Sequence, residues 1–242
     1  MITGEREGIR KMKRFLLKLS GEALSGKKGT GFDEATVLAV AEQIKALTAE
    51  GVQLGIVIGG GNFWRGRTSE TIQRVQADQI GMLATVMNCL YVSEICRHIG
   101  LETDIYTPFI CGSFTKLYGK DAMEESFASG KLVFFAGGTG HPFFSTDTAT
   151  VLRAVEMGAQ AILLAKAVDG IYDSDPKLNP DAKKYDQISI EKVVADKLAA
   201  MDLTASIMCM EQRLPMLVFA LEEEDSIIRT VHGDFHGTRV TV

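Results

Sequence analysis

Several signatures of common enzyme and metal-binding classes are missing from this sequence of 242 residues. There is no G-x-G-x-x-G, which argues against a Rossmann dehydrogenase, and no G-x-S-x-G, which argues against an α/β-hydrolase. The four cysteines form no C-x-x-C pair, and none has a histidine at zinc-finger spacing. A structural zinc site is therefore not expected, and the cysteines are predicted to be reduced thiols.

Excess positive charge and long apolar runs are also absent. The net charge is −5, which argues against a nucleic acid or a membrane surface as the main partner. We find no apolar run of the length needed to span a bilayer. The first residues, 1–13, are polar and lack an apolar signal region, so we expect a flexible tail and a cytoplasmic protein. A hydrophobic content of 46% is typical of a globular protein.

Strand-like and helix-like segments alternate along the rest of the chain. The patterns predict strands at 15–19, 54–58, 104–106, 131–136, 160–165, 215–220 and 237–242. They predict helices at 33–50, 70–99 and 225–231, and helices that begin near residues 145, 189 and 202. This alternation is typical of a three-layer αβα sandwich with a largely parallel central sheet. We expect a single domain over residues 14–242.

A run of three glycines, residues 59–61, follows the second predicted strand, and Arg65 follows four residues later. Such a turn lets backbone N–H groups approach an anion, although glycine is also the usual residue of a plain tight turn. Lys18 lies inside the first strand, where it must either extend to solvent or meet an anion. The carboxyl ends of parallel strands share one sheet edge, so Ser20 and Gly21 should lie beside the glycine run.

A similar arrangement recurs at residues 137–147. Glycines follow the strand at 131–136, and Ser145, Thr146 and Asp147 then begin a helix. Hydroxyl and N–H groups there suit an oxyanion, although one such residue also serves as an ordinary N-cap. By contrast, Gly21 to Lys28 matches most of a P-loop but has Lys28 where a hydroxyl is required, so we interpret 24–32 as a loop.

The segment 70–99 is helical in pattern and apolar on most sides of its C-terminal part. We expect a break near residues 77–81, because the segment exceeds a typical helix length and contains Gly81. A helix that is apolar all round is either central or covered by another subunit, and we favour an oligomer contact.

The predicted strand ends therefore carry more polar residues than one phosphate group would need. They fit a site that holds two phosphorylated groups end to end. The set comprises Lys18, Gly21, Gly60, Gly61, Arg65, Thr139, Ser145, Thr146, Lys166 and Asp202.

Long motifs, in order from residue 15 to the C-terminus, resemble those of the bacterial UMP kinases of the amino acid kinase family. They are Lys18-Leu19-Ser20-Gly21-Glu22-Ala23-Leu24, Val57-Ile58-Gly59-Gly60-Gly61-Asn62, Phe63-Trp64-Arg65-Gly66, Gly81-Met82-Leu83-Ala84-Thr85-Val86-Met87-Asn88, Gly138-Thr139-Gly140, Pro142-Phe143-Phe144-Ser145-Thr146-Asp147, Val168-Asp169-Gly170 and Met201-Asp202-Leu203-Thr204-Ala205. Two features depart from the family pattern: His141 replaces a common asparagine, and the spacing around Lys166 differs.

The resemblance implies that ATP phosphorylates UMP to give UDP, with Mg²⁺ bound as Mg-ATP and no metal held by protein side chains. It implies catalytic roles for Lys18, Arg65, Asp147 and Asp202, with Asp202 orienting Lys18 and Asp147 aligning the reacting groups. The implied ATP-binding residues are Lys18, Leu19, Ser20, Gly21, Gly61, Arg65, Lys166, Tyr172 and Asp175. The implied UMP-binding residues are Gly60, Asp78, Thr139, Gly140, His141, Pro142, Phe143, Phe144, Ser145 and Thr146.

The same resemblance implies that the N-terminal part binds UMP and the C-terminal part binds ATP. It also implies a role in pyrimidine and CTP biosynthesis, a homohexamer and possible regulation by GTP and UTP.

Two alternatives remain open. One is a family member that phosphorylates a carboxylate or a carbamate, and the other is a non-catalytic nucleotide-binding regulator. Only four histidines are present, but this does not argue against phosphoryl transfer to a phosphate acceptor, because such an acceptor needs no general base.

Overall fold

The computed structural model describes residues 14–64, 71–176, 178–198, 200–234 and 236–242. Within these ranges the strands of the central sheet follow the order β4-β3-β5-β2-β1-β6-β10-β11-β9. Their bounds are β1 Arg14–Leu19, β2 Gln53–Ile58, β3 Thr103–Thr107, β4 Lys116–Leu117, β5 Leu132–Phe135, β6 Ala161–Lys166, β9 Gln187–Ser189, β10 Met216–Ala220 and β11 Gly237–Thr241. A separate small sheet pairs β7, Ile171–Tyr172, with β8, Lys184–Tyr185.

The sheet is parallel except where β10 meets β11. At its centre Leu19 of β1 lies opposite both Ile58 of β2 and Ala165 of β6. The predicted parallel β1–β2 pair is therefore confirmed. The carboxyl ends of β1, β2, β5, β6 and β10 meet at one edge, because parallel strands end on the same side.

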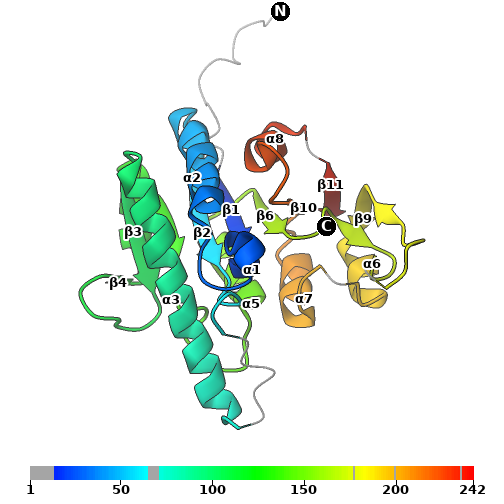
Figure 1. The fold of residues 1–242 in the computed structure, drawn as a ribbon, viewed down its shortest axis with the longest axis horizontal. Coiled ribbons are helices and arrows are strands. Elements are labelled where there is room, and N and C mark those ends of the chain that lie inside the picture. The colour runs from blue at the N-terminus through cyan, green and yellow to red at the C-terminus, as the bar shows by residue number, and fades with distance from the viewer. Residues whose placement is uncertain (1–13, 65–70, 177, 199, 235) are drawn as a thin grey trace, which may run out of the picture.

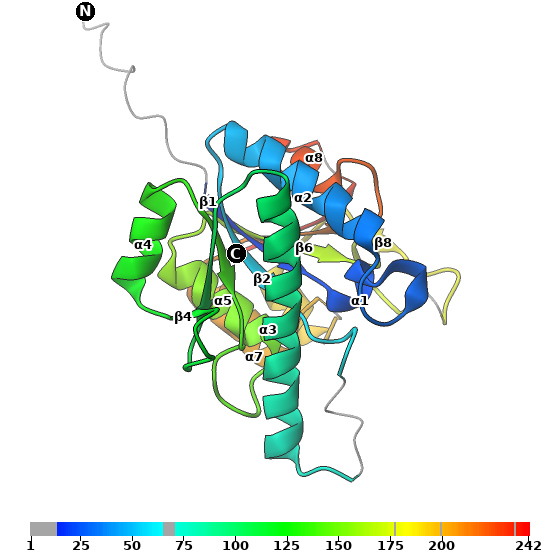
Figure 2. The same ribbon diagram turned by 60° about the vertical axis from the view of Figure 1, so that its left-hand side comes forward.

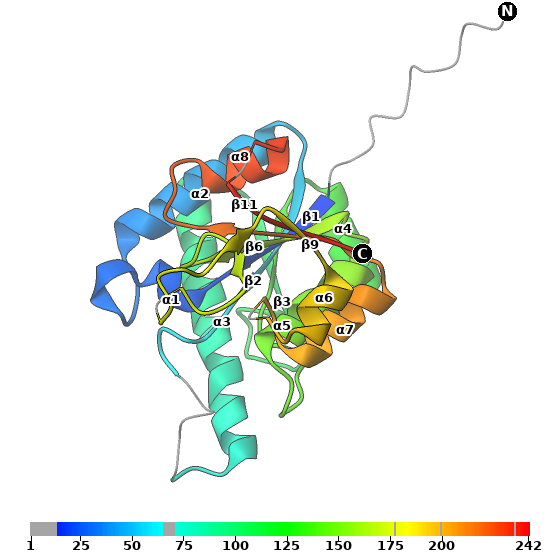
Figure 3. The ribbon, with the colours of Figure 1, turned by 90° about the vertical axis from the view of Figure 1, so that its right-hand side faces the viewer.

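Helices cover both faces of the sheet (Figures 1 and 3). One hydrophobic core lies between the sheet and α2, α3 and α8, and a second lies between the sheet and α4, α5, α6 and α7. The predicted three-layer sandwich is thus confirmed. The bounds are α1 Gly21–Leu24, η1 Gly26–Lys28, α2 Glu34–Ala49, α3 Arg74–His98, α4 Lys120–Ala128, α5 Thr146–Glu156, α6 Ile190–Ala195, α7 Leu203–Glu211 and α8 Ser226–His232.

Helix starts follow local capping chemistry. Asp33 caps α2 by accepting from the Thr36 N–H at 3.0 Å, and Ser189 caps α6 by accepting from Lys192 at 3.2 Å. Ser145 and Asp202 cap α5 and α7 in the same way. Such caps satisfy N–H groups that lack a partner within the helix, which explains why these starts were predictable from sequence.

Helix α3 is unbroken from Arg74 to His98, so the predicted break near 77–81 is wrong (Figure 2). Glycine inside a helix costs about 1 kcal/mol relative to alanine, but tertiary contacts offset this cost. The Trp64 indole N–H donates to the carbonyl of Ala77 at 2.8 Å. A Cβ added to Gly60 would lie 3.0 Å from the Gly81 carbonyl oxygen, so the glycine turn packs closely on the same stretch.

By length and composition alone, α3 could also cross a bilayer, contrary to the expectation that no segment reaches this length. Half of its most apolar window is buried within the fold. It packs on β2, β3, β5 and α2, as the core helix of a globular domain does.

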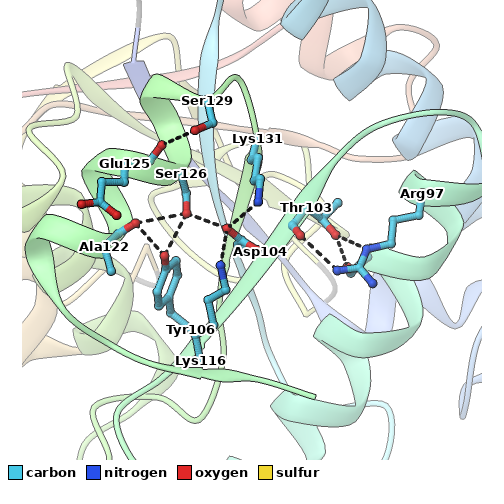
Figure 4. A network of polar contacts seen from close by, with 11 residues as sticks. Arg97, Thr103, Asp104, Tyr106, Lys116, Ala122, Glu125, Ser126, Ser129 and Lys131 are labelled. Atoms are coloured by element: carbon cyan, nitrogen blue, oxygen red, sulfur yellow. Dashed lines mark hydrogen bonds and ion pairs between the residues drawn. The ribbon is translucent and has the colours of Figure 1, made fainter. Parts of the chain in front are cut away.

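A polar cluster ties the outer strands to α4 (Figure 4). Asp104 of β3 accepts from Ser126 of α4 at 2.7 Å and faces Lys116 at 2.8 Å and Lys131 at 3.3 Å. Tyr106 shares the Ser126 hydroxyl at 2.8 Å. These contacts hold the short strand β4, which sequence patterns did not predict.

Candidate active site

A cleft of about 530 Å³ lies at the carboxyl edge of the central strands. It is lined by ends of the strands and by one face of α3. The lining residues are Lys18, Ser20, Gly21, Glu22, Gly59, Gly60, Gly61, Trp64, Arg74, Ala77, Asp78, Gly81, Met82, Thr85, Gly138, Thr139, Phe144, Ser145, Thr146, Asp147, Lys166, Ala200, Met201 and Asp202. The topology thus brings together residues that are up to 184 positions apart in the chain, as sheet-edge sites in α/β proteins commonly do.

The floor of the cleft is the junction between the ends of β1 and β2. The Gly59 N–H donates to the Leu19 carbonyl at 3.0 Å. A Cβ on Gly21 would clash with the Gly59 carbonyl and with the Asn62 side chain. Because only glycine fits at Gly21, the two chain segments can lie in direct backbone contact, as the sequence predicted.

Lys18 meets Asp147 across the cleft. Side chains alternate along a strand, so Lys18 shares the face of Leu16, which packs in the core beside α5. Asp147 lies in the first turn of α5, and the Lys18 ammonium donates to its carboxylate. Burial alone would raise the pKa of Asp147, but the charge of Lys18 and its hydrogen bond hold that pKa below the usual value.

Asp202 supports this pair without touching Lys18 in the described contacts. Its backbone N–H donates to Asp147 at 3.3 Å, while its carboxylate accepts from the Ala205 N–H at 2.9 Å and from the Ser145 hydroxyl. Among the described contacts Asp147 is the direct partner of Lys18, and Asp202 reaches Lys18 only through Asp147. The side chain of Asp202 is engaged as the N-cap of α7.

Lys166, the last residue of β6, is largely buried beside the same pair. Its ammonium donates to the Ala200 carbonyl at 2.6 Å. Burial, followed by the charge of Lys18, lowers the pKa of Lys166 from 10.5 to about 8. A buried cation of this kind is a favourable place for an anion, because a negative ligand would relieve both effects.

At the opposite end, Asp78 of α3 binds the loop that precedes α5. Its carboxylate accepts from the Phe143 N–H at 2.8 Å and pairs with Arg74 at 2.8 Å. Phe143 has φ of +71°, a left-handed conformation that costs a non-glycine residue roughly 1–2 kcal/mol. The contact with Asp78 offsets this strain and fixes the loop against α3.

Not every predicted residue lines the cleft. Leu19 is fully buried in β1, and Gly140, His141, Pro142 and Phe143 lie in the adjoining loop outside the lining set. Tyr172 and Asp175 lie near the small sheet, where the Tyr172 hydroxyl donates to Asp169 at 2.6 Å. Arg65 lies outside the described residues.

The face of α3 was largely missed by the sequence patterns. Arg74, Ala77, Asp78, Gly81, Met82 and Thr85 all line the cleft, and their spacing of three and four residues defines one helical face. With Asp78 as a starting point, this spacing could have identified the others. Glu22 and Trp64 were also missed as lining residues, although both lie in the quoted motifs.

The side chains available as metal ligands determine how the cleft can bind a metal ion. Among the described residues, no group of three histidine, cysteine or acidic side chains could hold a metal ion. The Asp147 and Asp202 carboxylates already accept hydrogen bonds from Lys18 and Ser145. This donor set fits Mg²⁺ carried by nucleotide phosphates, because Mg²⁺ in such sites takes few protein ligands.

Comparison with known proteins gives consistent matches. The model of the amino acid kinase family matches residues 13–220. A UMP kinase structure from Bacillus anthracis is 36% identical with a TM-score of 0.90, covering 95% of this chain and 96% of that chain. One from Ureaplasma parvum is 31% identical with a TM-score of 0.90, covering 96% of this chain and 100% of that chain.

A uridylate kinase structure from Archaeoglobus fulgidus is 23% identical with a TM-score of 0.74, covering 95% of this chain and 100% of that chain, and supports the fold alone. The family model spans well over half of the chain and agrees with the observed sandwich. The chain belongs to the amino acid kinase family.

Proposed function

We propose that this protein is a UMP kinase, which transfers the γ-phosphoryl group of ATP to UMP and releases UDP and ADP. The observation that carries the proposal is a cleft whose lining brings Lys18, Asp147 and Lys166 together with the glycine-rich turns that follow β2 and β5. The two UMP kinase structures with TM-scores of 0.90 support this choice of acceptor.

The chemistry needs positioning and charge more than proton transfer. The acceptor is a phosphate oxygen, which is already a nucleophile near neutral pH, and the transition state of phosphoryl transfer is loose. In the proposed mechanism Lys18 bridges the donor and acceptor phosphates, and Asp147 holds its ammonium in place. Lys166 adds positive charge on the donor side, where a negatively charged phosphate favours its protonated form.

We assign the N-terminal part of the 14–242 domain to the acceptor and the C-terminal part to the donor. Asp78 would bind the acceptor ribose, and Gly60 with residues 139–146 would surround the rest of UMP. Lys18, Ser20, Gly21, Gly61 and Lys166 would hold the ATP phosphates, with Arg65 reaching over both phosphate groups. Tyr172 and Asp175 would contact the adenosine portion, beyond the lining of the cleft.

Mg²⁺ would enter with ATP, held chiefly by phosphate oxygens and water. When bound, it would neutralise charge on the transferred phosphoryl group. No described side chain is assigned to it as a dedicated ligand.

We further propose a cytoplasmic homohexamer that serves pyrimidine and CTP biosynthesis and responds to GTP and UTP. Helix α3 supports a subunit contact, because Ile80, Leu83 and Met87 are 39%, 51% and 46% exposed on it.

The test is a coupled ADP-release assay with UMP, CMP, dUMP, acetylglutamate and carbamate as separate acceptors. ADP release with UMP above all others is expected. Release with acetylglutamate or carbamate instead would favour a different kinase of the family. Binding of ATP without release for any acceptor would favour the nucleotide-binding regulator.

A further inference from the structure

Two asparagines lie behind the glycine turn and have no part in the mechanism above. Asn62 follows the turn and Asn88 lies in the middle of α3, and their exposed fractions are 2% and 0%. Neither side chain lines the cleft. Buried amides are costly unless they are fully hydrogen-bonded, so such a pair calls for an explanation.

The two side chains form a closed pair. The Asn62 amide donates to the Asn88 side-chain oxygen at 3.0 Å, and the Asn88 amide donates to the Asn62 side-chain oxygen at 2.7 Å. Each amide has one further N–H. Asn62 gives it to the Gly31 carbonyl at 2.8 Å, and Asn88 gives it to the Gly59 carbonyl at 2.6 Å. All four side-chain donor hydrogens are thereby used.

The pair connects three parts of the chain at the carboxyl edge of the central strands, namely α3, the glycine turn and the loop after α1. Asn88 reaches the turn from α3, and Asn62 reaches the loop after α1 through Gly31. The main chain of Asn62 adds two contacts, since its carbonyl accepts from Gly31 N–H at 3.3 Å and from the Thr30 hydroxyl at 2.9 Å. Gly21 also packs against both amides.

The bond to Gly59 has a specific consequence for the cleft. The carbonyl of Gly59 and the N–H of Gly60 belong to one planar trans peptide, so they point in opposite directions. With the Gly59 carbonyl held by Asn88, the Gly60 N–H is directed away from α3 at this point. Three glycines in succession have no side chains to fix their own peptide planes, so the orientation depends on this bond.

We propose that Asn62 and Asn88 are positioning residues that fix the peptide plane of Gly60 and so set the geometry of phosphate binding. This inference rests on the proposed function of the cleft. Asn88 holds the turn directly, and Asn62 holds Asn88. A small misplacement of groups that position reactants lowers the rate of an enzyme, so the pair should affect turnover in excess of its effect on stability.

The test compares Asn88→Leu, Asn62→Leu and the double variant with wild type. Leucine has the same branching and the same number of side-chain heavy atoms as asparagine, and in the double variant neither amide is left facing an apolar partner. Ser93→Ala is the matched control, because Ser93 is also buried on α3 but bonds Thr103 of β3 at 2.7 Å and not the turn. Thermal unfolding, kcat and both KM values are measured for each, with assays well below every unfolding midpoint.

We expect kcat to fall by roughly tenfold or more in Asn88→Leu and in the double variant, and by less in Asn62→Leu. The loss of stability in the double variant should be smaller than the sum of the losses in the two single variants, while its kcat should stay as low as that of Asn88→Leu. Ser93→Ala should lose stability and keep kcat. A folded Asn88→Leu protein with wild-type kcat would overturn the proposal, as would kcat losses that follow the unfolding midpoints in all four variants.

The wild-type arm separates this inference from the proposed function. If wild type releases no ADP with UMP, the proposed function fails, and the pair is then judged by the affinities for UMP and for Mg-ATP, each measured by calorimetry. A weaker affinity for either nucleotide in Asn88→Leu, with wild-type affinities in Ser93→Ala, would support the positioning role. Equal affinities for both nucleotides in all variants would refute it.

Discussion

Two aspartates in this molecule, the buried Asp104 and the partly buried Asp147, each lie close to a pair of lysines, but the lysines of the two clusters differ in their partners. Asp104, near the outer edge of the sheet, has carboxylate contacts with Lys116 at 2.8 Å and Lys131 at 3.3 Å (Figure 4). Asp147, at the centre of the sheet edge, pairs with Lys18, while the ammonium of Lys166 donates to a backbone carbonyl.

The difference appears in the lysines. The hydrogen bond to Asp104 raises the pKa of Lys116 above its usual value. Burial and the charge of Lys18 lower the pKa of Lys166 to about 8. Both outer lysines thus contact the Asp104 carboxylate and serve structure, whereas in the central cluster Lys166 is a cation in conditions that favour an incoming anion.

The largest expected effect is on turnover when Lys18 is removed. Lys18→Ala should keep the fold and lose roughly 10²–10³ in kcat, because a preorganised charge at the transferred phosphoryl group is lost. The matched change in the outer cluster, Lys116→Ala, should leave kcat close to wild type. Near-normal turnover of folded Lys18→Ala would remove this lysine from the mechanism.

Next in size is the stability effect of Asp104→Asn, which we expect to cost about 1–3 kcal/mol without changing kcat. Burial alone would raise the pKa of Asp104, but hydrogen bonds from Lys116 and Ser126 and the nearby lysine charges hold that pKa below 3.8. Its stabilising contribution is therefore present above pH 3.8 and is lost as pH falls through the lower folded value.

Chemical denaturation at several pH values checks this. The difference in unfolding free energy between wild type and Asp104→Asn should shrink as the solution becomes acidic. A difference that grows in acid would contradict the assigned sign.

A smaller effect is expected at Asp78. Asp78→Asn should raise the KM for UMP by roughly tenfold, since a charged hydrogen-bond acceptor is replaced by a neutral one. The KM for ATP serves as the internal control and should change little. Equal changes in both constants would show that the substitution disturbs the cleft as a whole and that Asp78 is not specific to the acceptor.

The smallest effect concerns the proton on Lys166. Since its pKa is about 8 in the free protein, part of the population is neutral at pH 8. Phosphate charge raises that pKa, so Mg-ATP binding at pH 8 should take up a fraction of a proton, and well below pH 8 it should take up almost none. Calorimetry in buffers of different ionisation enthalpy measures the uptake, and Lys166→Met should abolish it. Uptake that persists in Lys166→Met would assign the proton to another group.

The same depressed pKa affects folding stability. The unfolded state binds more protons than the folded state between about pH 8 and 10.5, so Lys166 makes unfolding free energy rise with pH in that window. Lys166→Met should show a flatter profile there.

Much of this organisation is encoded locally and was predictable. The pattern of apolar residues along the chain identified β1, β2, β5 and β6, and polar N-cap residues identified the starts of α2 and α6. Parallel pairing of β1 and β2 is sufficient to place Gly21 beside Gly59, where the two backbones are in contact. These features depend on residues close in sequence or on a simple rule of sheet topology.

Sequence by itself therefore determined the layers, the two glycine turns and the family. Tertiary structure decided that Lys18 pairs with Asp147, that α3 continues through Gly81, and that Asn88 holds the Gly59 carbonyl. Each of these depends on contacts between distant segments, and local propensity cannot rank such contacts, because their energies come from burial and from partners that only the folded chain brings together.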